Sequence, residues 1–208
     1  IVDRNKFNNE INAISQLLNG MISLYNTVKP LEVEIAIKNV GKKFIYWGVP
    51  GNDDLIPQNI SILLPCIFHW YGNSLYNYAR LAGFIVGREL GCITDYDIEM
   101  EPQRKKIKNF CDSYVKEIKD LQEIVKWRNK VSAHFALTDP RNDDNIATMN
   151  SSIIFPIIIE NNKFRTAGKM IMSLGDANNT YDSEIPDWSL TESFELLAPR
   201  FWPEIKFK

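Results

Sequence analysis

The stretch IVKWRNKVSAHFA, residues 124–136, ends a long amphipathic pattern near the middle of the chain. Upstream of it, four apolar residues recur at helical spacing: Tyr114, Ile118, Leu121 and Val125. Charged and amide side chains fill the positions between them, so the pattern predicts a helix with one buried face. Continued along the chain, the buried face reaches Arg128 and Ser132. The sequence therefore predicts an arginine on the side of the helix that faces the core.

A buried guanidinium needs polar partners, because an unpaired buried charge is strongly destabilising. His134 falls on the neighbouring stripe of the same helix, with Ile124, Trp127 and Val131. Arg128 and His134 are six residues apart, which is about 120° around an ideal helix. The two side chains would therefore not converge on one phosphate from a single straight helix.

Arg128-Asn129, followed by four residues and then His134, resembles the signature of the HEPN superfamily. The resemblance implies a small helical bundle that usually forms a dimer, in which two copies of the motif line one cleft. Many HEPN domains are metal-independent RNases of toxin–antitoxin, anti-phage and RNA-decay systems, and others are non-catalytic binding modules. The implied partners are a second copy of the chain, RNA and an antitoxin protein.

The three motif residues suit phosphodiester chemistry. Histidine titrates near neutral pH, so His134 can act as a general acid or base toward a ribose 2′-hydroxyl or a leaving oxygen. Arg128 can hold a phosphate through two hydrogen bonds and stabilise charge in the transition state, and Asn129 can orient either group. The alternative is structural: Arg128 pairs with a glutamate, and His134 lies at the helix C-terminus, where positive charge is favoured.

A second helix is predicted from about residue 65 to residue 90. Four polar residues recur along it at steps of four, three and four, which keeps them on one narrow face: His69, Asn73, Tyr76 and Arg80. We interpret this polar line as the substrate-binding wall of the same cleft. The alternatives are a polar network inside the bundle and a solvated stripe. Beside it, Ala79, Gly83 and Gly87 predict a close helix approach, either within the bundle or across a dimer.

The remaining pattern predicts more helix and one hairpin. Helices are expected over residues 3–27, 31–47 and 102–136. Lys29-Pro30 ends the first of them, and the 102–136 stretch forms one helix or two, with a break near 109–113. The 31–47 stretch also has the alternating pattern of a strand. Residues 152–159 and 164–172 are expected to pair as a hairpin, followed by a loop over 175–187 and a short helix that begins near Ser189.

These elements define a mainly α protein: a bundle of four to five helices with a C-terminal β-hairpin. Residues 1–150 are expected to form the HEPN-like bundle. Residues 151–208 are expected to form a hairpin and a short helix packed on the bundle, within the same domain.

Composition excludes several function classes. The net charge is −2, from 24 basic and 26 acidic residues, so RNA binding would need a local basic patch. Three widely spaced cysteines without a CxxC motif, and only two histidines, predict neither a disulfide framework nor a metal site. Without a Gly-rich phosphate loop, no cofactor is expected. The interrupted apolar runs predict no membrane span and a cytoplasmic protein.

Three functions follow from these observations. The first is a metal-independent endoribonuclease of a toxin or defence system, which the arginine on the core stripe favours. The second is a non-catalytic, dimeric HEPN-like module that binds a nucleotide or a partner protein. The third is a helical scaffold without a site. The near-neutral charge favours the last two.

Overall fold

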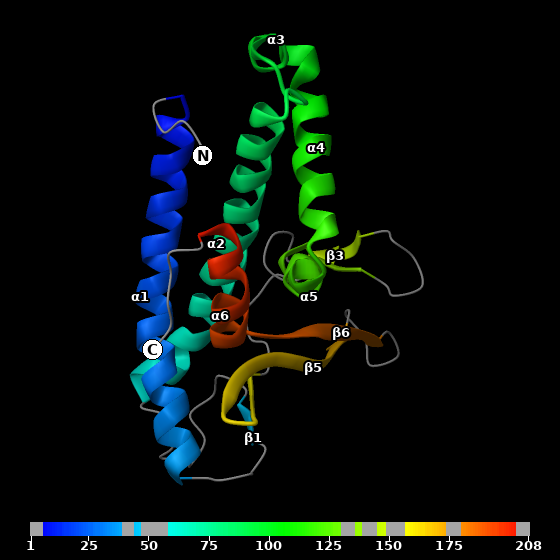
Figure 1. Ribbon diagram of the computed structural model, residues 1–208. Helices are drawn as coiled ribbons and strands as arrows, with labels where there is room; N and C mark the ends of the chain where they lie inside the picture. The colour runs from blue at the N-terminus through cyan, green and yellow to red at the C-terminus, as the bar shows by residue number, and fades with distance from the viewer. Residues whose placement is uncertain are drawn as a thin grey trace.

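The computed structural model describes residues 6–38, 44–46, 58–129, 136–138, 145–148, 157–173 and 180–202. This part of the chain is mainly helical, as expected, and the expected hairpin belongs to a small antiparallel sheet (Figure 1). Its α-helices are α1 (Asn8–Lys38), α2 (Gln58–Glu89), α3 (Asp95–Glu99), α4 (Arg104–Glu117), α5 (Gln122–Trp127) and α6 (Leu190–Phe201). Figure 1 shows α1, α2 and α4 side by side, with α5 below α4 and α6 beside the middle of α2.

Helix α1 is longer than predicted, because it continues through Pro30 to Lys38. A proline inside a helix removes one backbone hydrogen bond and favours a break. Here the turns beyond it bury Glu32 and Ile35, which are 3% and 2% exposed, so tertiary contacts hold the helix together. The helix expected over 31–47 is therefore correct only as far as Lys38, and Phe44–Tyr46 forms strand β1 instead.

Helix α2 begins at Gln58, before the predicted start at residue 65, and Pro65 lies inside it. Its buried face consists of fully buried side chains: Leu64, Phe68, Tyr71, Leu75 and Tyr78. A Cβ atom on Gly83 would lie 2.8 Å from the Tyr114 ring, and one on Gly87 would lie 2.7 Å from the Phe110 ring. These two glycines therefore allow α4 to approach α2 within one chain.

The helix predicted over 102–136 breaks later than expected, at Ile118 rather than near 109–113. Ile118 has an extended backbone and is followed by a short 3₁₀ turn, Lys119–Leu121. The Gln122 side chain donates hydrogen bonds to the carbonyl oxygens of Val115, Lys116 and Ile118, which satisfies the end of α4. The break gives α5 its own direction and its own buried residues, Ile124 and Trp127.

The larger sheet has the strand order β1-β4-β5-β6 and is antiparallel throughout. The predicted hairpin is present as β4 (Ile157–Glu160) and β5 (Lys163–Ser173), with Ile159 opposite Phe164; residues 152–156 lie outside the described residues. Asn161 and Asn162 form its turn at φ values of 52° and 60°. The loop expected over 175–187 is wrong from Thr180 onward, because Thr180–Ser189 forms β6, while residues 175–179 lie outside the described residues.

A second, two-stranded sheet pairs β2 (Ala136–Thr138) with β3 (Asn145–Thr148). Helix α6 begins directly after Ser189, whose hydroxyl accepts a hydrogen bond from Glu192 N, as the capping pattern predicted. No helix among the described residues is long and apolar enough to cross a membrane.

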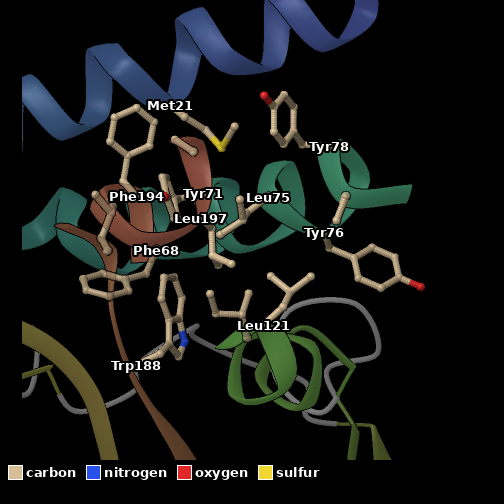
Figure 2. Close-up of a cluster of buried hydrophobic side chains, with 14 of the residues drawn as sticks. Met21, Phe68, Tyr71, Leu75, Tyr76, Tyr78, Leu121, Trp188, Phe194 and Leu197 are labelled. Atoms are coloured by element: carbon tan, nitrogen blue, oxygen red, sulfur yellow. The ribbon is translucent and has the colours of Figure 1, made fainter. Parts of the chain in front are cut away.

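One buried cluster joins the helices to the C-terminal segment (Figure 2). Trp188 from β6 lies with its ring centroid 5.0 Å from that of Phe68 on α2. Phe194 from α6 lies 5.0 Å from Tyr25 on α1, measured in the same way. The sheet and α6 therefore pack on the bundle and complete its core.

Candidate functional site

The predicted polar line on α2 meets the end of α5 at Tyr76. The Arg128 guanidinium carbon lies 4.6 Å from the centroid of the Tyr76 ring, and the Arg80 guanidinium carbon lies 5.7 Å from it. Both distances allow a cation–π interaction. Tyr76 is only 8% exposed, so it is held rigidly between the core and the two cations. Two residues from the α2 line and one from the motif thus form a local basic cluster in a chain of net charge −2.

Asp112 on α4 balances part of this charge. Its Oδ1 atom lies 3.2 Å from Arg80 Nε and accepts a hydrogen bond from Tyr76 Oη at 3.4 Å. Burial raises the pKa of the Tyr76 phenol above its usual value of 10, and Asp112 raises it further, whereas Arg80 and Arg128 act in the opposite direction. The phenol is therefore protonated at neutral pH and donates to the carboxylate.

Arg128 is half-buried, as the stripe predicted, but its contacts differ from the predicted glutamate pair. Its backbone N–H donates to the carbonyl oxygens of Ile124 and Val125, and residues 128 and 129 form a wider, π-helical turn. Its Nη1 donates to Asn129 Oδ1 at 2.9 Å. Within the described residues, Arg128 Nε is buried without a hydrogen-bond acceptor and no carboxylate pairs with the guanidinium. Arg128 therefore retains donor capacity beside an aromatic ring.

His69 and Asn73 lie one to two turns before Tyr76 on α2. The His69 ring centroid lies 4.9 Å from that of Trp127, and burial lowers the pKa of His69 to about 4. His69 is therefore neutral at pH 7 and contributes no charge to the site. Asn73 Nδ2 donates to the His69 carbonyl oxygen at 2.9 Å, a bond within its own helix. The part of the predicted line that joins the basic cluster is thus Tyr76 and Arg80.

Two positions that support the site were not predicted. A Cβ atom on Gly72 would lie 2.7 Å from the Trp127 ring, so this glycine is what allows the end of α5 to rest on α2. The sequence pattern does not single out Asp112, and only the contact between α2 and α4 reveals its position. Trp127 is fully buried, whereas Trp70 is 44% exposed.

His134 lies outside the described residues, so its position relative to Arg128 stays a prediction. The basic run at the start of α4 is partly neutralised, since Lys106 Nζ lies 2.8 Å from Asp97 and Arg104 lies 3.8 Å from Glu101. Among the residues described here, no group of three or more His, Cys, Asp or Glu side chains is arranged to hold a metal ion. The basic cluster around Tyr76 is therefore the best-defined candidate site.

An open pocket of about 340 Å³ adjoins this cluster on its Arg80 side. It is lined by Asn77, Arg80, Leu81, Phe84 and Cys111.

Comparisons of the chain with protein-family models, with curated proteins and with solved structures found no match.

Proposed function

We propose that the protein is a HEPN-like, metal-independent endoribonuclease of a toxin or defence system, with Arg128, Asn129 and His134 as its catalytic residues. The observation that supports this proposal is the meeting of Arg128, at the end of the motif helix, with Tyr76 and Arg80 of α2. Two guanidinium groups beside a buried phenol form an anion-binding arrangement, and arginine is suited to phosphate recognition. The type of reaction, metal-independent RNA cleavage, is proposed because the motif resembles the HEPN signature.

The chemistry divides among the three motif residues. His134 takes the proton from a ribose 2′-hydroxyl, whose oxygen attacks the adjacent phosphorus. Arg128 binds the phosphate oxygens and stabilises the charge that builds up on them, while Asn129 orients the Arg128 guanidinium. The bond from phosphorus to the 5′ oxygen breaks, that oxygen receives a proton from water, and His134 releases to water the proton that it took. The products are a 2′,3′-cyclic phosphate and a free 5′-hydroxyl.

The test is RNA cleavage by the purified protein. We expect the wild type to cut single-stranded RNA in the presence of a chelator and to leave a cyclic phosphate. His134→Ala is expected to abolish cleavage without changing the melting temperature, because the substitution leaves every buried residue of the described core in place. Arg128→Ala is expected to lower the rate by at least ~100-fold, as for the loss of one preorganised donor to a developing charge, and Asn129→Ala is expected to lower it less.

Lys126→Ala is the matched control for Arg128→Ala. Lys126 carries the same charge on the same helix, is exposed, and pairs with Glu123 instead of with the cluster. Its removal is expected to leave the cleavage rate within about twofold, since a surface ion pair contributes little. If Arg128→Ala cuts RNA as fast as Lys126→Ala, Arg128 is not catalytic. If the wild type cuts no member of a broad RNA panel, the nuclease proposal fails.

The second candidate function is a non-catalytic, dimeric module that binds a nucleotide or a partner protein. Asp112 favours it, because this carboxylate already neutralises Arg80 at 3.2 Å and accepts from Tyr76. The net charge of −2 favours it as well. The cleavage experiment distinguishes the two functions. A binding module would bind RNA, a nucleotide or a protein without cleaving RNA, and His134→Ala would leave that binding unchanged.

A further inference from the structure

We propose that the pocket between α2 and α4 binds a nucleobase of single-stranded RNA, next to a phosphate that Arg80 holds. This inference rests on the proposed function, because it assigns a substrate feature to the same site. Four of the five residues that line the pocket, Asn77, Arg80, Leu81 and Phe84, recur at steps of three, one and three along α2, and Cys111 of α4 forms the opposite side. The pocket therefore continues the α2 face that carries Tyr76.

The size and openness of the pocket suit a single flat ligand group. Its volume of about 340 Å³ lies at the lower end of the range typical of small-molecule pockets, ~300–1,000 Å³. Phe84 and Leu81 are half-buried and Asn77 is exposed, so the pocket opens to solvent along the helix. An open groove of this kind admits one base of an extended strand, while the rest of the strand stays outside.

The lining has the chemistry that a base needs. Phe84 offers an aromatic face, and base–aromatic stacking is the main source of affinity for single strands. Asn77 carries an amide that can donate to and accept from a base edge. Cys111 is 4% exposed, and burial raises the pKa of its thiol, so this wall is uncharged at neutral pH. The interior therefore favours a neutral, planar group over a phosphate.

Arg80 connects the base pocket to the basic cluster. Its side chain lines the pocket, and its guanidinium carbon also lies 5.7 Å from the Tyr76 ring, on the side of the molecule that Arg128 approaches. A phosphate held by Arg80 would therefore have its own base beside Phe84. This places base recognition beside the basic cluster to which Arg128 belongs.

Among the described residues, Phe84 is not a member of the buried core cluster, nor of the partly buried shell packed against it, whereas the neighbouring Leu81 belongs to that shell. Truncation of Phe84 is therefore expected to leave the fold intact. This makes Phe84 the position at which the inference is tested.

The experiment is a binding cycle with a single-stranded RNA of about 12 nucleotides, measured by fluorescence anisotropy in chelator with the His134→Ala protein to prevent cleavage. Phe84→Ala is expected to weaken binding about tenfold, and Asn77→Ala to weaken it less. The same RNA is then prepared with one abasic nucleotide at successive positions. At one position, the abasic RNA is expected to bind the protein that retains Phe84 about tenfold more weakly than intact RNA does. The Phe84→Ala variant is expected to bind this abasic RNA and intact RNA equally well.

Tyr96→Ala is the matched control, since Tyr96 is a 61% exposed aromatic residue on α3, away from the pocket. It is expected to leave affinity unchanged. If RNA binds but Phe84→Ala and Tyr96→Ala behave alike, or no abasic position couples to Phe84, the pocket does not hold a base and only this inference fails. If the protein retains its fold but binds no RNA, the proposed function fails with it. Capture of a protein partner that Phe84→Ala abolishes, without RNA binding, would also overturn the inference.

Discussion

Asp112 determines how much of the positive charge around Tyr76 is available to a ligand. Its carboxylate stands 3.2 Å from Arg80 Nε and 3.4 Å from Tyr76 Oη, where a phosphate oxygen would make the same contacts. The Arg80 and Asp112 side chains are 32% and 29% exposed, so an incoming anion can reach both. Asp112 therefore competes with a phosphate for Arg80 in the free protein.

We expect Asp112→Asn to tighten binding of single-stranded RNA by about three- to tenfold at low salt, because a partly exposed ion pair contributes on the order of 1 kcal/mol. The gain should shrink as salt rises, since the interaction is screened. Titrations at two salt concentrations measure it. Asp95→Asn makes the same charge change at a distant ion pair with Arg88 and serves as the control. Equal gains from both variants would mean that only net charge matters.

At the scale of single residues, spacing along the chain predicted which polar side chains share a face but not what they touch. The steps from His69 to Arg80 place four residues on one side of α2, and the stripe through Val125 placed Arg128 toward the interior. Both results depend only on helical periodicity. Asp112 and Gly72 depend on how α4 and α5 pack against α2, and a single sequence carries no periodic signal for such contacts.

At the scale of elements, the core determined where helices end when local signals disagreed. Pro30 predicted an end to α1, but the burial of Ile35 beyond it outweighs the missing backbone hydrogen bond. The hairpin was predictable, because the Asn161-Asn162 turn favours positive φ and the strand before it, β4, is rich in isoleucine. Strand β6 was missed because its sequence is polar. Its backbone hydrogen bonds come from pairing with β5, which the sequence of β6 alone does not indicate.

Glu32 fastens the end of α1 to the hairpin and to α6. It is 3% exposed and accepts hydrogen bonds from Phe164 N at 2.9 Å and from Thr191 Oγ1 at 2.7 Å. Burial raises the pKa of its carboxyl group, and these hydrogen bonds, with Lys163, oppose that shift. The residue therefore holds three elements together through one buried carboxylate.

We expect Glu32→Ala to lower the free energy of unfolding by about 3 kcal/mol, because it leaves a buried backbone N–H and a hydroxyl without acceptors. Glu32→Gln should cost about 1 kcal/mol, since its amide oxygen can still accept. Urea unfolding at pH 7 measures both. Glu34→Ala is the control: Glu34 lies on the same helix, is 52% exposed and pairs with Lys38. A loss for Glu32→Ala as small as that for Glu34→Ala would rule out the anchoring role.

At the scale of the whole molecule, the small-residue stripe of α2 is occupied within the chain. Gly83 and Gly87 contact Tyr114 and Phe110 of α4, so this stripe is not free to receive a second copy. The dimer that the motif resemblance implies must then use another face. The end of α5 at Asn129, which is exposed, is the surface at which we expect it.

We expect the protein to form a homodimer with the ends of both α5 helices near the two-fold axis. Light scattering should give twice the chain mass of 24.0 kDa, and the interface should bury more than ~1,000 Å². With the exposed Cys66 and Cys92 replaced by serine, Asn129→Cys should form a disulfide between copies under mild oxidation. Lys105→Cys, at an exposed position near the start of α4, should form none.

This last prediction bears on the enzyme proposal, because the motif resemblance implies a cleft that two copies of the motif line. Two motifs across an axis can supply an arginine from one copy and a histidine from the other. A protein that stays monomeric at ~100 μM and yields no Asn129→Cys disulfide would therefore remove the geometric basis for cleavage. RNA binding by the basic cluster around Tyr76 would then stand without catalysis.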